Sequence, residues 1–179
     1  YSDDEVSDLL GAARGLSTRH QRENTIVLLS LRLGAGLGNS DLTALVGADI
    51  EATGSAVVIN VAVGRRPRRV AVRGEWEDEV LRRAHEVGDR PMFHPDRSRP
   101  QSKDIPNFMD RLVLPGLPHL GLQRLRVTWI VRQLDAGVPA HLVAAAAGVG
   151  PPQIGRYFQF LRPIEPDQVD RLLRAGPDR

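Results

Sequence analysis

Arginines that could bind phosphate are concentrated in one short stretch of the chain. Four of the five positions from 65 to 69 are arginine, namely Arg65, Arg66, Arg68 and Arg69. Residues 65–132 carry 15 basic and 9 acidic side chains, although the whole chain has a net charge of only +2. Guanidinium groups bind phosphate oxygens, and a local excess of positive charge attracts polyanions. The stretch therefore predicts contact with a DNA backbone, with a solvated turn as the alternative.

The composition excludes several other chemistries. The chain has no Cys, which excludes a disulfide framework, a thiolate zinc site and a cysteine nucleophile. Its five histidines show no paired spacing for a metal, so we expect neither a metal nor a cofactor. Residues 34–38, GAGLG, look like a phosphate-cradling loop, but they follow a predicted helix and lack a Lys-Ser/Thr pair.

The apolar patterning predicts a mainly helical α+β domain with a small antiparallel sheet. The β-branched run 56–63, a turn at 64–68 and a return strand at 69–72 form a hairpin that presents the arginines. A long loop over 88–106 is expected from its prolines. Helices are expected before Gly15 and over 22–35, 41–45, 75–87, 105–113, 121–136, 139–147, 151–161 and 166–174.

The overall composition is that of a globular chain. It has 179 residues, with 41% hydrophobic and 26% charged, and no apolar run long enough for a membrane span. The acidic start does not resemble a secretion signal, so we expect a soluble, cytoplasmic chain, associated with the nucleoid if it binds DNA. We expect one domain over 1–162, followed by an amphipathic helix or tail over 163–179.

Three stretches contain motifs in a characteristic order. Residues 28–50 read LLSLRLGAGLGNSDLTALVGADI, residues 56–73 form the basic hairpin, and residues 122–160 begin LQRLRVTW and end IGRYFQF. In this order they resemble the catalytic domain of the tyrosine recombinase (phage integrase) family. The first stretch is similar to its T-G-L-R and W-x-D-I segment. The third is similar to the block from H-x-L-R-H-T through L-G-H to the nucleophilic tyrosine.

The resemblance implies a known chemistry, DNA strand exchange through a covalent phosphotyrosine. Two arginines and one or two histidines hold the phosphate, and a hairpin lysine protonates the leaving oxygen. Carried over by position, Tyr157 is the nucleophile and Arg126 the second arginine. Gly38 stands at the first arginine and Gln123 and Val149 at histidine positions. The hairpin lysine falls among the arginines at 65–68, and arginine is a poor general acid.

These substitutions predict a pseudoenzyme that binds double-stranded DNA through the hairpin, Arg124 and Arg126 but has lost strand cleavage. One alternative is an active recombinase that uses Tyr157 with substitute cations such as Arg32 or Arg124. Others are a helix-turn-helix regulator over 138–158, with Gln153 and Arg156 as base readers, and a protein-interaction module. In structural interpretations, Arg126 pairs with a carboxylate such as Asp49 or caps a helix end, and Tyr157 packs in the core. The family also implies self-association through the C-terminal helix.

Overall fold

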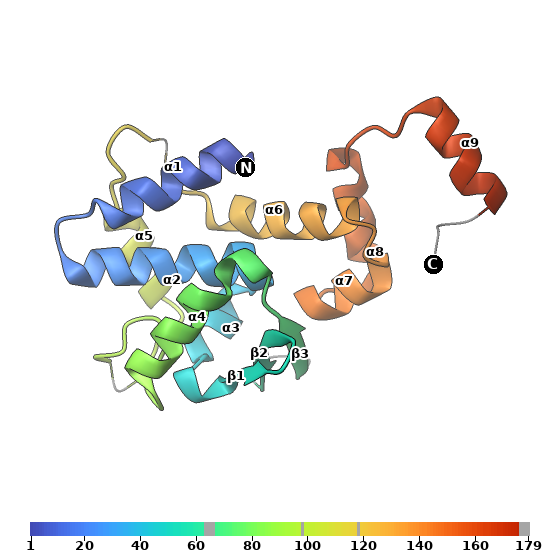
Figure 1. Ribbon diagram of the computed structural model, residues 1–179. Coiled ribbons are helices and arrows are strands. Elements are labelled where there is room, and N and C mark those ends of the chain that lie inside the picture. Colours follow the sequence, from blue (N-terminus) through green and yellow to red (C-terminus); the bar gives the residue numbers. More distant parts are fainter. Residues whose placement is uncertain (63–66, 98, 118, 176–179) are drawn as a thin grey trace.

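The computed structural model describes residues 1–62, 67–97, 99–117 and 119–175. Its centre is helix α2 (Arg19–Ala35), whose residues are all buried from Asn24 to Ala35. Helices α1 (Asp3–Arg14), α4 (Gly74–Val87) and α6 (Leu122–Asp135) pack against α2 (Figure 1). The expected start of α2 at 22 was wrong, because the Thr18 hydroxyl accepts from the Gln21 N–H at 3.1 Å and caps the helix three residues earlier.

The end of α2 is fixed by a tight turn against α6. Gly36 is left-handed at φ 62°, and a Cβ there would lie 2.2 Å from Cε3 of Trp129. The Trp129 indole donates to the Gly34 carbonyl at 3.1 Å. The chain then enters α3 (Asn39–Ala44), which is capped by Asp41 accepting from the Gly38 N–H at 2.8 Å, two residues before the start expected at 41.

A three-stranded antiparallel sheet lies beside these helices in the order β1-β2-β3. It contains β1 (Ile50–Thr53), β2 (Ala56–Val61) and β3 (Arg68–Ala71), with Val61 opposite Arg68. The α+β class and the hairpin are confirmed, although β2 ends at Val61, two residues before the expected end. The sequence did not predict β1, because only Ile50 in that strand is partly buried and no apolar alternation marks it.

The C-terminal part contains short helices beyond α6. They are α7 (Ala140–Ala147), α8 (Pro151–Ile154), the 3-10 helix η2 (Gly155–Phe160) and α9 (Pro166–Ala175). The expected continuous helix over 151–161 is therefore wrong: Gly155 disfavours an α-helix and the chain tightens there into η2. Helix α5 (Asp104–Arg111) follows the proline-rich loop.

Helix α9 leads away from the rest of the domain (Figure 1). Leu173 on this helix is 81% exposed, and Ile164 just before it is 52% exposed. Among the described residues, none of the helices combines the length and apolar character that a membrane crossing requires.

Candidate phosphate-binding site

Two positions that lie far apart in the sequence meet where α2 ends and α6 begins. An ideal Cβ built on Gly38 would lie 3.5 Å from Nη1 of Arg126. Gly38 has an extended backbone, with φ −79° and ψ 170°, so its conformation would accept any side chain. Arg126 is partly buried and its Nη2 donates to the Ala147 carbonyl at the end of α7. The structure thus brings together the two positions that the family resemblance assigns to arginines.

Arg68 joins the same cluster from β3. Its Nη2 donates to Asp41 Oδ2 at 2.6 Å, and its Nε donates to the Ala146 carbonyl at 2.8 Å. The side chains of Arg68 and Asp41 are only 11% and 7% exposed. A Cβ on left-handed Gly148 would lie 2.9 Å from Arg68 Cζ, so the end of α7 packs directly on the guanidinium. Arg68 therefore ties β3 to α3 and α7.

Tyr157 from η2 is 3% exposed. Its hydroxyl accepts from Arg156 Nη2 at 2.8 Å. Burial lowers the pKa of Arg126; Tyr157 and Asp41 oppose this, while Arg68 and Arg156 lower it further. The charges of these four groups therefore act on Arg126, in a site with more positive than negative charge.

Arg32 is a buried member of the cluster that the sequence indicated only as a possible substitute. Its side chain comes from the last turn of α2, is 2% exposed and donates through Nη2 to Asn39 Oδ1. Burial, and then the charge of Arg126, lowers the pKa of Arg32 to about 10, while Asp41 opposes this. The sequence signal was an arginine inside an apolar run; its contact with Asn39 depends on the turn at Gly36.

Known proteins with this architecture are recombinases. No family model and no curated protein sequence matches the chain. XerA recombinase superposes with a TM-score of 0.69 at 15% identity, covering 100% of this chain and 65% of XerA. XerH site-specific recombinase bound to palindromic difH substrate gives 0.65 at 15%, covering 98% of this chain and 52% of XerH. A lambda integrase dimer bound to a COC' core site gives 0.63 at 16%, covering 92% and 50%.

The fold is that of the tyrosine recombinases. The chain spans between half and two thirds of the length of these structures. Within this recombinase fold, Gly38 lies beside Arg126, and the buried Tyr157 acts on Arg126 electrostatically. Of the other described residues that the sequence predicted to bind the DNA backbone, only Arg68 belongs to the cluster around Arg126.

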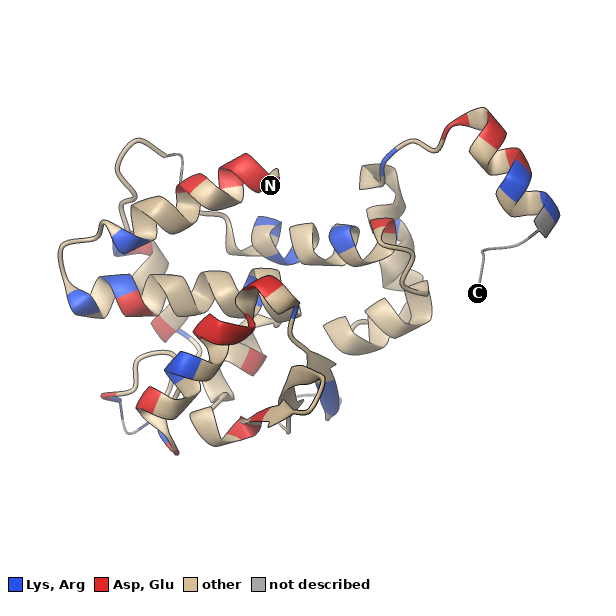
Figure 2. Cartoon of the chain, viewed as in Figure 1, with Lys and Arg blue, Asp and Glu red and all other residues tan. Residues whose placement is uncertain are grey.

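The other predicted residues lie outside this cluster or outside the described residues. Arg65 and Arg66 are not among the described residues, whereas Arg69 is exposed on β3. Arg124 points toward α1, where it donates to Glu5 at 2.7 Å and lies 4.0 Å above the Tyr1 ring. Gln123 is exposed and lines the groove between α1 and α6. Figure 2 shows basic residues along α6 and on β3, and acidic residues at the start of α1.

Two of the alternative interpretations can be compared with the contacts of these residues. Asp49 Oδ2 accepts from the Val46 N–H at 3.0 Å, so Asp49 was the wrong partner for Arg126. Arg126 instead donates to the carbonyl of Ala147, the last residue of α7, as the helix-capping interpretation expected. The helix-turn-helix interpretation needs a recognition helix, but α8 has only four residues. Its Gln153 also caps the helix by accepting from the Gly150 N–H at 3.1 Å. Val149 is partly buried against the core.

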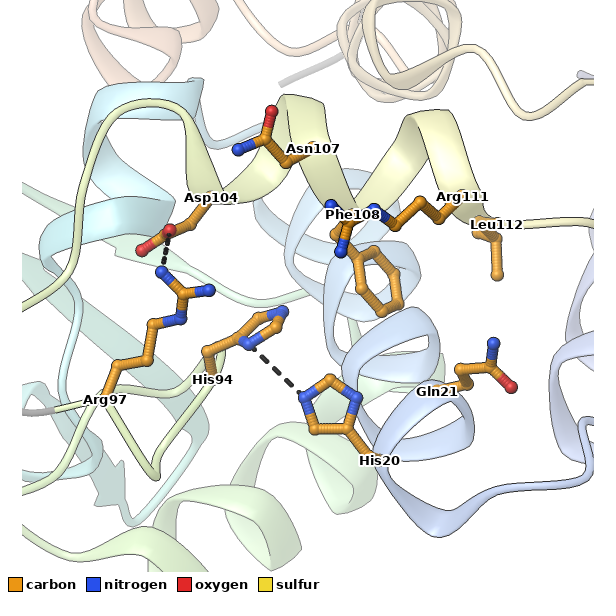
Figure 3. Close-up of a pocket in the computed structure, with 9 residues that line it drawn as sticks. All are labelled: His20, Gln21, His94, Arg97, Asp104, Asn107, Phe108, Arg111 and Leu112. Atoms are coloured by element: carbon orange, nitrogen blue, oxygen red, sulfur yellow. Dashed lines mark hydrogen bonds and ion pairs between the residues drawn. The ribbon is translucent and has the colours of Figure 1, made fainter.

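A second pocket lies at the opposite end of α2, lined by His20, His94 and Asp104 among others (Figure 3). His20 Nε2 is 3.3 Å from His94 Nδ1, and the buried Asn24 contacts both segments: it donates to the His20 carbonyl and accepts from the His94 N–H, each at 2.8 Å. Among the described residues, no group of three or more His, Asp or Glu side chains is placed to hold a metal.

The His94 pocket predicts a specific loss of stability in acid. Burial, the neighbouring His20 and the charge of Arg97 lower the pKa of His94 to about 4, from 6.5. The unfolded chain therefore binds the proton first, so this stability is present above pH 6.5 and is lost as the pH falls to about 4. The melting temperature of His94→Asn, which tolerates the positive φ of 53°, should depend less on pH across this range. His85→Asn, an exposed site on α4, is the control; equal profiles for all three proteins would contradict the prediction.

Proposed function

We propose that this chain is an integrase-like domain that binds double-stranded DNA and has lost the strand-cleavage activity of the tyrosine recombinases. The observation that carries the proposal is the contact between Gly38 and Arg126. An ideal Cβ built on Gly38 would lie 3.5 Å from Nη1 of Arg126, yet glycine has no side chain to project toward that guanidinium. The site therefore keeps the geometry of a two-arginine phosphate pocket without the first arginine at its family position.

The magnitude of the missing interactions supports a loss of cleavage. Removing one preorganised donor typically costs about 10²–10³ in rate. Gln123, Val149 and the hairpin arginines take the places of two histidines and a lysine, in addition to Gly38. The effects are not additive, but we expect a combined loss of about 10⁵ or more. Tyr157 is also buried and engaged by Arg156 rather than presented at the surface.

DNA binding is supported by the fold and by the charge distribution. The XerH and lambda integrase structures are complexes with DNA sites. In this chain Arg69 is exposed on β3, and Arg65 and Arg66 lie shortly before it in the sequence. We assign these three arginines to contacts with the DNA backbone. We assign Arg124 to the same partner, because a phosphate could replace its exposed contact with Glu5. Binding to DNA would locate the protein on the nucleoid.

We expect a gel shift with duplex DNA that weakens as the salt concentration rises, because arginine–phosphate contacts release counterions. Changing Arg65, Arg66 and Arg69 together to alanine should reduce the slope of log affinity against log salt by about 3. Arg111→Ala, exposed on α5, is the control and should leave the slope unchanged. An unchanged slope in the triple variant would remove the hairpin from the interface.

The loss of cleavage is tested with a library of nicked duplexes of random sequence. A cleaving recombinase would remain covalently attached to such a substrate and would migrate with it on a denaturing gel. We expect no adduct with the wild-type chain. An adduct that disappears in Tyr157→Phe would show an active enzyme instead, and would mean that substitute cations restore the chemistry.

We also propose that the chain self-associates through α9, with residues 163–179 acting as a separate segment after the domain over 1–162. Helix α9 extends away from the domain and presents Leu173, which is 81% exposed, with Ile164 at its base. Burying this apolar surface against another copy would be favourable.

A further inference from the structure

The strongest unexplained feature of the site is an imbalance of buried charge. Asp41 forms its ion pair with Arg68. Among the described residues, neither Arg32 nor Arg126 has an ion-pair partner, although Arg32 is 2% exposed. A buried charge without a counter-charge costs several kcal/mol even after relaxation of the surroundings. A buried arginine and a partly buried one, each without a carboxylate partner among the described residues and with the charge of Arg126 acting on Arg32, indicate a site that is completed by an anion.

Unused hydrogen-bond donors support this conclusion. The Nε atoms of Arg32 and Arg126 are both buried and have no acceptor among the described residues. Buried donors in native proteins are nearly always paired, so two adjacent guanidinium groups with an unpaired N–H each require an explanation. A tetrahedral oxyanion has several acceptor oxygens and matches the planar donor arrangement of arginine.

Asn39 shows how an anion could reach Arg32. Its side chain is exposed at the start of α3, and its Oδ1 accepts from Arg32 Nη2. The Arg32 guanidinium therefore lies immediately beneath a surface residue, the one that follows Gly38 in the chain. The amide oxygen of Asn39 occupies one acceptor position that an oxygen of a phosphate would take.

We propose that Arg32 is a phosphate-binding residue that supplies, from the interior of α2, the second guanidinium that Gly38 cannot supply. Together with Arg126 it would bind a backbone phosphate of DNA. This assignment rests on the proposed DNA-binding function and makes the site a phosphate clasp. The alternative role for Arg32 is structural, holding α3 through Asn39, and the two roles predict opposite effects of substitution.

The test is thermal unfolding with and without inorganic phosphate, with ionic strength matched by chloride. Phosphate that binds only the folded chain should raise the wild-type melting temperature by a few degrees. Arg32→Met removes the buried charge while keeping most of the side-chain volume. It should melt at or above the wild-type temperature without phosphate and should show no phosphate response. Arg111→Met, at an exposed arginine on α5, is the control and should keep the response.

A second variant covers the case in which Arg32→Met does not fold. Asn39→Asp places a carboxylate against Arg32 and thereby supplies the missing anion from within the chain. It should melt above the wild-type temperature without phosphate and should gain less from added phosphate. A lower melting temperature with an unchanged phosphate response would overturn the proposal.

The remaining outcomes separate this inference from the proposed function. A wild-type chain that does not respond to phosphate, or a folded Arg32→Met that responds as wild type, overturns the role of Arg32. The gel shift with hairpin variants is independent of both results. If DNA does not bind but the phosphate response depends on Arg32, the proposed DNA function fails and the anion site remains.

Discussion

Arg68→Ala should destabilise the chain by about 3–5 kcal/mol, the usual cost of removing one partner of a buried ion pair. The substitution leaves Asp41 buried without its cation and also removes the hydrogen bond to the Ala146 carbonyl. Chemical denaturation followed by circular dichroism measures this loss. Arg69→Ala changes the adjacent but exposed arginine and should lie within about 0.5 kcal/mol of wild type.

The same pair of variants distinguishes the two roles that an arginine in this hairpin can have. Arg69→Ala should weaken DNA binding without loss of stability, whereas Arg68→Ala should lose stability. The double variant Arg68→Ala/Asp41→Asn should recover part of the stability, because the unpaired buried charge is gone. An Arg68→Ala protein that is as stable as wild type but no longer binds DNA would show that Arg68 serves the ligand rather than the fold.

The convergence at the site could be predicted from the sequence because it is carried by ordered motifs. Gly38 and Arg126 occur in two distant stretches that resemble the recombinase family, and the structure places these two positions side by side. Nothing in the local sequence could separate Arg68 from Arg69. Which of the two turns inward depends on the register of β3 against β2 and on the position of α7.

The features that the sequence missed depend on contacts between distant residues. His20 and His94 are 74 positions apart, and their approach depends on one buried residue, Asn24, that hydrogen-bonds to both segments. An aspartate in the first turn of a short helix, such as Asp41, is typically an exposed capping residue. Asp41 is buried in this chain because Arg68 packs against it. Strand β1 was missed for a local reason, since exposed strands lack the apolar alternation on which prediction relies.

Gly36→Ala should lower the free energy of unfolding by about 3 kcal/mol or more, because backbone strain and overpacking act together. The left-handed φ of 62° is unfavourable for alanine, and the new Cβ would lie 2.2 Å from Cε3 of Trp129. The indole cannot easily withdraw, because it is 2% exposed and bonded to the Gly34 carbonyl. The melting temperature and the free energy of unfolding measure the effect.

Gly137→Ala is the matched control for this variant. Gly137 also has a positive φ, 79°, but a Cβ there meets no atom within 4 Å, so its substitution adds only the backbone strain. Equal losses in the two variants would show that Trp129 can move aside. A larger loss at Gly36 would show that the turn is held rigidly by α6. Because this turn sets Gly38 beside Arg126 and Asn39 over Arg32, any Gly36→Ala protein that folds should also lose part of its response to phosphate.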